Sequence, residues 1–226
     1  DSSGSRSIEH ILPQSLGNAL HTLPVGVVCD HCNNYFSKEV EKPFLETPWA
    51  RTLRFHQALV SKKGRIPSIA GLLQRSVPVS AIRSSKDGST HLEVPSGAFN
   101  FIASLSQGEL ILPLEGPWPS GPIASRFAAK VAIEAMAARV MHLEGGVDWL
   151  SNEDQFDLLR DHARRGRQMD WPTHIRRIYA ADHPVLGPRG EAEQILHEFD
   201  FLVTQSSEWY FILAIFGLEF TINLGG

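Results

Sequence analysis

The chain has 226 residues, of which 42% are hydrophobic and 20% are charged, and its net charge is −4. This composition is typical of a soluble globular protein of one or two domains with enough residues to bury a core. The charge argues against a protein that coats nucleic acid along its whole length, although a small patch meeting a few phosphates stays compatible with it.

The chain has only two cysteines, Cys29 and Cys32. A lone Cys-x-x-Cys pair indicates metal binding or redox chemistry, because the two cysteines are too near in sequence for a disulfide between them to stabilise a large loop. No signal peptide is visible, and the longest apolar run, 209–218, is too short to span a bilayer. We therefore expect a cytoplasmic protein that does not associate with a membrane. Since the chain begins with Asp1, we also expect residues upstream of it.

The first part of the chain, residues 1–46, is short, polar and rich in special residues. Glu9 and His10 are adjacent on a segment predicted to be extended, so their side chains should point to opposite sides. A turn is expected over 13–18, a short strand at 27–28 running into Cys29, and a helix over 33–41.

The second part, residues 47–226, begins at a break marked by Thr47 and Pro48. Its patterns predict a helix over 51–60, strands at 77–82, 91–94 and 108–113, and a loop over 115–122. A helix is expected over 125–144, capped by Ser125, and a second over 152–165, ended by Gly166. The tail is predicted to form a hairpin from strands 195–204 and 209–223. The fold class is therefore α+β: a small N-terminal module and a larger mixed α/β region with a C-terminal hairpin.

The residue types in the first part suggest a reaction. A carboxylate such as Glu9 can hold a cation while a neighbouring imidazole, here His10, removes a proton from water, because the pKa of histidine lies near working pH. The segment Glu-His-Ile-x-Pro-x-Ser-Leu-Gly-Asn, followed by Val-Cys-x-x-Cys-Asn-Asn, resembles the HNH endonucleases. The resemblance covers roughly residues 7–42 and implies a ββα-metal fold: a β-hairpin followed by a helix around one divalent metal.

The resemblance implies a role for each matching residue. It makes His10 the general base, Glu9 and Asn33 the ligands of a catalytic metal, and Cys29 and Cys32 half of a structural zinc (Zn²⁺) site. Oxygen ligands suit Mg²⁺ or Mn²⁺ better than zinc. The alternative for Asn33 is that it caps a helix. His31, between the cysteines, could be a ligand but is expected to be exposed to solvent, and the remaining histidines other than His10 are interpreted as structural.

Three departures from the family pattern matter. The other Cys-x-x-Cys of the zinc site is missing and would fall just before Asp1. Ser37 stands where some members have a second histidine, and the stretch 22–25 lacks the asparagine that orients the catalytic histidine. A backbone carbonyl or Asn18 would have to replace that asparagine.

Several basic residues are candidates for contacts with nucleic acid. An arginine cluster near the end of the helix over 152–165 fits either a phosphate-binding patch or a solvated helix end. The predicted nucleic-acid-binding residues are Lys38, Arg51, Arg54, Arg164, Arg165 and Arg167.

The predicted function is metal-dependent hydrolysis of phosphodiester bonds, with DNA favoured as substrate. One rival is an HNH fold that has lost catalysis and only binds nucleic acid or a partner. Another is an effector subunit of a prokaryotic antiviral system, in which residues 47–226 bind a protein partner or a second copy; this rests on analogy among HNH proteins.

Overall fold

The computed structural model describes residues 5–166, 171–183, 185–186, 190, 192–193 and 197–225. The chain forms two compact units. The first contains Asp1–Pro13, Asn18–Phe44 and Pro119–Gly226, and the second contains Gln14–Gly17 and Leu45–Trp118. The N-terminal segment with the Glu-His and Cys-x-x-Cys motifs therefore packs in one unit with the last half of the chain.

A short hairpin and a helix form the N-terminal part of the first unit. Strand β1 (Glu9–His10) pairs antiparallel with β2 (Thr22–Leu23). The expected strand at 27–28 is wrong, since only an isolated bridge joins Val25 and Val28. The partner strand lies earlier because the Ile11 N–H donates to the His21 carbonyl (3.1 Å), which aligns β1 with the residues after His21.

The helix predicted over 33–41 is confirmed, but it begins earlier. It runs as α1 (Asp30–Phe36), a π-helical turn η3 (Ser37–Glu41) and α2 (Lys42–Leu45). Cys29 is the N-cap, because its backbone is extended and its sulfur accepts from the Cys32 N–H (3.4 Å). Asn33 therefore lies inside the helix and does not cap it.

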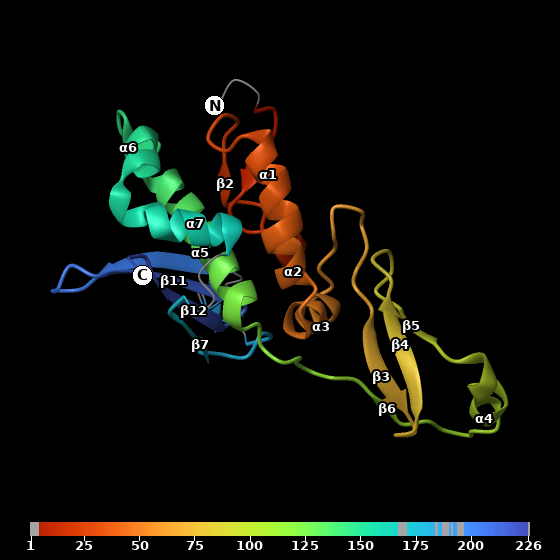
Figure 1. Cartoon of the computed structure of the whole chain (residues 1–226). Helices are drawn as coiled ribbons and strands as arrows, with labels where there is room; N and C mark the ends of the chain where they lie inside the picture. The colour runs from red at the N-terminus through yellow and green to blue at the C-terminus, as the bar shows by residue number, and fades with distance from the viewer. Residues whose placement is uncertain are drawn as a thin grey trace. The chain divides into compact units, whose positions relative to one another are not determined.

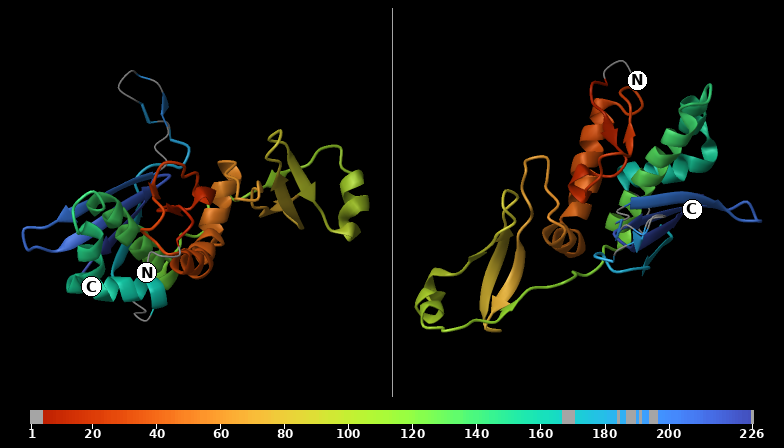
Figure 2. Two further views of the ribbon diagram at one scale, coloured as in Figure 1. Left: turned by 90° about the horizontal axis from the view of Figure 1, so that it is seen from above. Right: turned by 180° about the vertical axis from the view of Figure 1, so that it is seen from behind.

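Helix α5 (Gly121–Val140) is the central element of the first unit. It contacts β2, η3, α6 and α7 as well as β7 and β12 of the sheet. Figure 1 shows it between the N-terminal elements and the sheet, and Figure 2 shows the same arrangement from two other sides. Its N-cap is Ser120, so the predicted cap at Ser125 is wrong: Ser125 lies inside the helix, buried, with its Oγ 2.8 Å from Nε2 of the buried His162.

The helices after α5 are shorter than predicted. The chain leaves α5 in a turn closed by the Leu143 N–H on the Val140 carbonyl (2.9 Å), and α6 (Gly146–Asn152) follows. A 3-10 turn η5 (Asp154–Phe156) then leads into α7 (Asp157–Arg165). Gly166 ends α7 as predicted, and the single helices predicted over 125–144 and 152–165 are wrong in their bounds.

A four-stranded antiparallel sheet completes the first unit. Its strand order is β10 (His197–Val203), β11 (Trp209–Ile215), β12 (Leu218–Asn223) and β7 (Thr173–Arg177). The C-terminal hairpin is confirmed, but 209–223 forms two strands, because Gly217 turns the chain at a positive φ of 76°. A Cβ there would lie 2.1 Å from the Tyr179 carbonyl oxygen, so only glycine fits.

Residues 195–196 of the predicted strand lie outside the described residues. A separate pair of short strands, β8 (Val185–Leu186) and β9 (Ala192–Glu193), is antiparallel.

Aromatic packing joins α2, α5 and the sheet. The rings of Phe44 and Phe127 are stacked with centroids 3.7 Å apart, and Phe220 of β12 lies 5.9 Å from Phe44. All three side chains are fully buried. The end of the N-terminal helix is therefore part of the same core as α5 and the sheet.

The second unit has its own helix and sheet. It contains the 3-10 turn η2 (Gln14–Leu16), α3 (Pro48–His56), β3 (Ile69–Leu73), β4 (Val77–Arg83), β5 (Thr90–Glu93), the 3-10 turn η4 (Ser96–Ala98), α4 (Phe99–Ala103) and β6 (Leu110–Ile111). The sheet is antiparallel in the order β5-β4-β3-β6. Thr47 caps α3 and Pro48 occupies its first turn, so the break predicted at these residues is a helix start, and α3 replaces the helix predicted over 51–60. Among the described residues, no helix is long and apolar enough to cross a membrane.

Candidate active site

The loop between β1 and β2 is held by one buried side chain, Asn18. Its amide nitrogen donates to the carbonyls of Leu12 (2.6 Å) and His21 (2.9 Å), and its oxygen accepts from the N–H groups of Leu20 (3.1 Å) and His21 (2.9 Å). Both amide protons are thus used within the loop. Asn18 therefore closes the hairpin and has no proton left with which to orient His10.

Asn33 is oriented by the segment that precedes β1. Its amide nitrogen donates to Ser7 Oγ (3.2 Å), and Ser7 Oγ in turn donates to Asp30 Oδ1 (2.7 Å). The backbone N–H groups of Arg6 and Ser7 also donate to the Asp30 carboxylate. These bonds tie α1 to the start of the hairpin and set the direction of the Asn33 amide.

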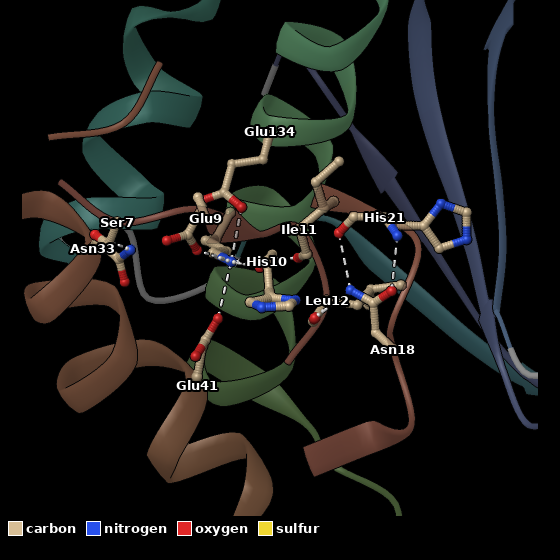
Figure 3. Close-up of polar contacts among 11 residues, drawn as sticks. Ser7, Glu9, His10, Ile11, Leu12, Asn18, His21, Asn33, Glu41 and Glu134 are labelled. Carbon is tan, nitrogen blue, oxygen red and sulfur yellow. Dashed lines mark hydrogen bonds and ion pairs between the residues drawn. The ribbon is translucent and has the colours of Figure 1, made fainter. Parts of the chain in front are cut away.

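Glu9 lies in a buried charged cluster centred on Lys130 of α5, which Figure 3 shows. Lys130 Nζ is 2.9 Å from Glu9 Oε1, 2.9 Å from Glu41 Oε1 and 2.8 Å from Glu134 Oε2. The same ammonium donates to the carbonyl oxygens of His10 (2.9 Å) and Ile11 (3.3 Å). The Lys130 side chain is wholly buried, so it is satisfied only by these contacts within the protein.

The three carboxylates keep Lys130 charged. Burial by itself would lower the pKa of the ammonium, but Glu134, Glu41 and Glu9 together hold that pKa above its usual value. Burial raises the pKa of the Glu134 carboxyl well above its usual range, and Lys130 offsets this only in part. Lys130 and the three carboxylates thus form a buried charged cluster that contacts the Glu-His motif through Glu9 and the His10 carbonyl.

His10 follows Glu9 on β1 and differs from it in exposure. Glu9 is 4% exposed, whereas His10 is partly exposed and lies opposite Thr22 in the hairpin. This alternation is expected of neighbours on a strand. His10 as a whole is partly exposed, while its ring nitrogen Nδ1 is buried.

Cys29 and Cys32 lie at the start of α1, where the backbone N–H of Cys32 donates to Cys29 Sγ (3.4 Å). The pKa of Cys29 is lowered, chiefly by the N–H of Cys32, and burial raises the pKa of Cys32. Arg164 of α7 donates to Cys32 Sγ (2.9 Å), and its guanidinium lies 5.2 Å from the Tyr35 ring centroid. Two cysteines supply two thiolate ligands, and a complete tetrahedral zinc site needs two more.

The predicted basic residues lie in different surroundings. Lys38 of η3 is exposed, Arg165 is 54% exposed and paired with Asp161, and the Arg164 guanidinium contacts Cys32 and Tyr35 within the fold. In the second unit, Arg51 donates to the Ser68 carbonyl (2.9 Å), and Arg54 is buried, which lowers its pKa. Arg167 lies outside the described residues.

Lys130, Glu41 and Glu134 were not predicted as part of the site, although two of them left a signal in the sequence. Lys130 and Glu134 are four residues apart in the otherwise apolar stretch Phe-Ala-Ala-Lys-Val-Ala-Ile-Glu-Ala-Met. Charged residues in such a stretch are rarely buried unless they are paired. A buried ion pair on this helix was therefore predictable, but its partner Glu9 was not.

The side chains of Glu9 and Asn33 carry oxygen donors of the kind that a hard divalent cation takes. Lys130 holds one carboxylate oxygen of Glu9, and Ser7 accepts a hydrogen bond from the amide nitrogen of Asn33. Outer hydrogen bonds of this kind commonly orient metal ligands. In the described part of the chain, no group of three or more His, Cys, Asp and Glu side chains could hold a metal. The donors present suit an ion such as Mg²⁺, which binds through one or two protein groups and keeps several waters.

A hairpin with Glu-His on its first strand, followed by a helix that carries an asparagine, defines the class of ββα nuclease modules. Residues 2–48 match the family of HNH endonucleases, and this N-terminal segment is an HNH domain. The match indicates a nuclease-type function and a nucleic-acid substrate. No match to the chain was found among curated proteins or among solved structures.

Proposed function

We propose that the protein is a metal-dependent endonuclease that hydrolyses phosphodiester bonds, most favourably in DNA, with His10 as general base and Glu9 and Asn33 as ligands of Mg²⁺ or Mn²⁺. The observation that carries the proposal is the placement of these residues within an HNH domain: a partly exposed His10 follows a buried, oriented Glu9 on β1, and Asn33 lies on α1. When bound, the metal would neutralise the negative charge that develops on the phosphate and the leaving oxygen.

The chain's own residues would perform the proton transfer. His10 takes a proton from a water molecule, whose oxygen forms a bond to phosphorus while the bond from phosphorus to the 3′ oxygen breaks. The leaving oxygen takes up a proton from solvent. Lys38, Arg51, Arg54, Arg164, Arg165 and Arg167 stay predictions as nucleic-acid contacts; of those described, Lys38 and Arg165 are exposed, and the Arg51 side chain is 42% exposed.

Metal dependence is the first test. Plasmid DNA incubated with the full chain is expected to be nicked or cut in Mg²⁺ or Mn²⁺ and to stay intact in excess EDTA, because the proposed site neutralises the phosphate charge only when a cation is bound. Agarose gels of supercoiled plasmid measure the result, and a single-stranded RNA in parallel tests the preference for DNA. Equal cleavage with and without EDTA would show that the proposed chemistry is wrong.

We also propose that Cys29 and Cys32 hold a structural zinc together with two further ligands. Cys29→Ser in the full-length protein is expected to lose the zinc and to unfold mainly the N-terminal part, because structural zinc binding is coupled to folding. Serine is itself a good N-cap, so the change removes the ligand while keeping the cap of α1. Elemental analysis of protein purified without chelator measures the zinc; a variant that retained it would contradict the assignment.

A second candidate function is an HNH-fold subunit without catalysis that binds nucleic acid or a protein partner. It is favoured by Ser37 at a position where some family members have histidine, and by the use of both Asn18 amide protons within the loop. Retained DNA binding with no cleavage in either metal would support it. A cytoplasmic effector role in an antiviral system, with 47–226 as the partner-binding region, stays a prediction that the mass of the protein in solution would address.

A further inference from the structure

We propose that Lys130 of α5 is a positioning residue of the nuclease site, which makes α5 part of the active centre although it lies outside the HNH segment. This inference rests on the proposed function. Lys130 reaches three consecutive residues of the motif: the Glu9 carboxylate at 2.9 Å and the backbone carbonyls of His10 at 2.9 Å and Ile11 at 3.3 Å.

The hairpin needs such support because it is very short. Strands β1 and β2 have two residues each, and an isolated two-stranded hairpin is at best marginally stable in water. A fully buried ammonium that donates to a side chain and to two carbonyls restricts both the direction of the Glu9 carboxylate and the path of the backbone that carries the His10 imidazole. Catalytic groups lose much of their efficiency when their supporting contacts are loose.

The geometry separates this role from simple docking of the helix. Glu41 of η3 and Glu134 of α5 also pair with Lys130, so the positive charge of Lys130 would be compensated in part without Glu9. A second cation on α5, Arg126, holds this helix against α1, η3 and α7. It donates to the carbonyls of Glu39 (3.3 Å) and Arg164 (2.8 Å) and to Tyr35 Oη (3.3 Å). The hydrogen bonds of Arg126 within the described residues go to the helical elements and not to β1, so Arg126 is the matched control for Lys130.

The test compares variants of the full chain in which stability and metal binding are measured separately. Lys130→Met alone would leave three clustered carboxylates, which is strongly destabilising. The main variant is therefore Lys130→Met with Glu134→Leu, which removes one of the three carboxylates together with the ammonium and so destabilises the core less than Lys130→Met alone. Lys130→Gln is the second variant: it keeps a donor for the carbonyls and removes the charge, and because it leaves three carboxylates it is compared only where its melting curve shows it folded. Arg126→Met is the control.

Mn²⁺ affinity is measured by titration calorimetry without nucleic acid. Plasmid cleavage is measured separately at saturating Mn²⁺. Both measurements are made at a temperature where melting curves show that each variant is folded. The double variant, which leaves the net charge of the cluster unchanged, is expected to bind Mn²⁺ on the order of 10- to 100-fold more weakly than the unmodified chain, the usual effect of losing an outer partner of a ligand. Lys130→Gln makes the cluster more negative, which favours cation binding, so its readout is cleavage at saturating Mn²⁺, which is expected to fall. Arg126→Met is expected to melt earlier with unchanged Mn²⁺ affinity.

The outcomes separate the two proposals. Wild-type Mn²⁺ affinity and cleavage in a folded Lys130 variant would overturn the positioning role while leaving the proposed nuclease intact. An equal loss of affinity in Arg126→Met would also overturn it, because the effect would then come from docking of α5. An unmodified chain that neither binds Mn²⁺ nor cleaves would overturn the proposed function, and this inference with it.

Discussion

His10→Ala is expected to lower the rate of DNA cleavage by on the order of 10²–10⁴-fold, the usual loss when a general base is removed. His10 is partly exposed at the edge of the hairpin, and its backbone carbonyl, not its ring, is bound by Lys130. The fold and Mn²⁺ binding should therefore persist in the variant. Rates of plasmid nicking at saturating metal, with Mn²⁺ titration on the same sample, check both expectations.

The comparison with Asn33→Ala separates a base from a ligand. Asn33→Ala should lose activity through weaker metal binding, so high Mg²⁺ should partly restore it, whereas no concentration of Mg²⁺ should restore His10→Ala. His142→Ala is a suitable control, because this exposed histidine follows α5 and has no assigned role. If added Mg²⁺ rescued His10→Ala, His10 would be a ligand; wild-type cleavage by His10→Ala would remove the basis for placing the site here.

Phe127→Ala is expected to destabilise the first unit by about 3–5 kcal/mol, the usual range for a large aromatic side chain removed from a core. Its ring is fully buried and stacked on Phe44 at the end of the N-terminal helix. The loss should therefore weaken the contact of the HNH segment with α5 and reduce cleavage as the temperature rises. Chemical denaturation followed by fluorescence measures the change.

The control for this variant is Phe101→Ala. Phe101 lies on α4 in the second unit and is 43% exposed, so its loss should change stability by less than about 0.5 kcal/mol. A change below about 1 kcal/mol for Phe127→Ala would mean that its cavity collapses, and that the stacked pair contributes little to the unit.

Much of the candidate site could be predicted from short stretches of sequence. Glu9 and His10 are neighbours, and Asn33 directly follows the cysteine pair, so residue order and spacing are enough to indicate an HNH domain, which the family match confirms over residues 2–48. The same holds for features set by local geometry. The strand predicted at 77–82 was indicated by alternating apolar and polar residues and is observed as β4. Gly166 ends α7 because glycine adopts a positive φ readily.

The tertiary structure decided which distant residues meet. Glu9 and Lys130 are 121 positions apart, and neither the spacing of the motif nor the pattern of α5 specifies that they pair. Strand β7 was not predicted, and its pairing with β12 makes it an edge strand of the sheet. The cap of α5 was misplaced because Ser125 bonds the buried His162. In each case the free energy comes from burial and pairing between remote segments. The sequence by itself therefore determined the candidate site residues, while packing decided what holds them in place.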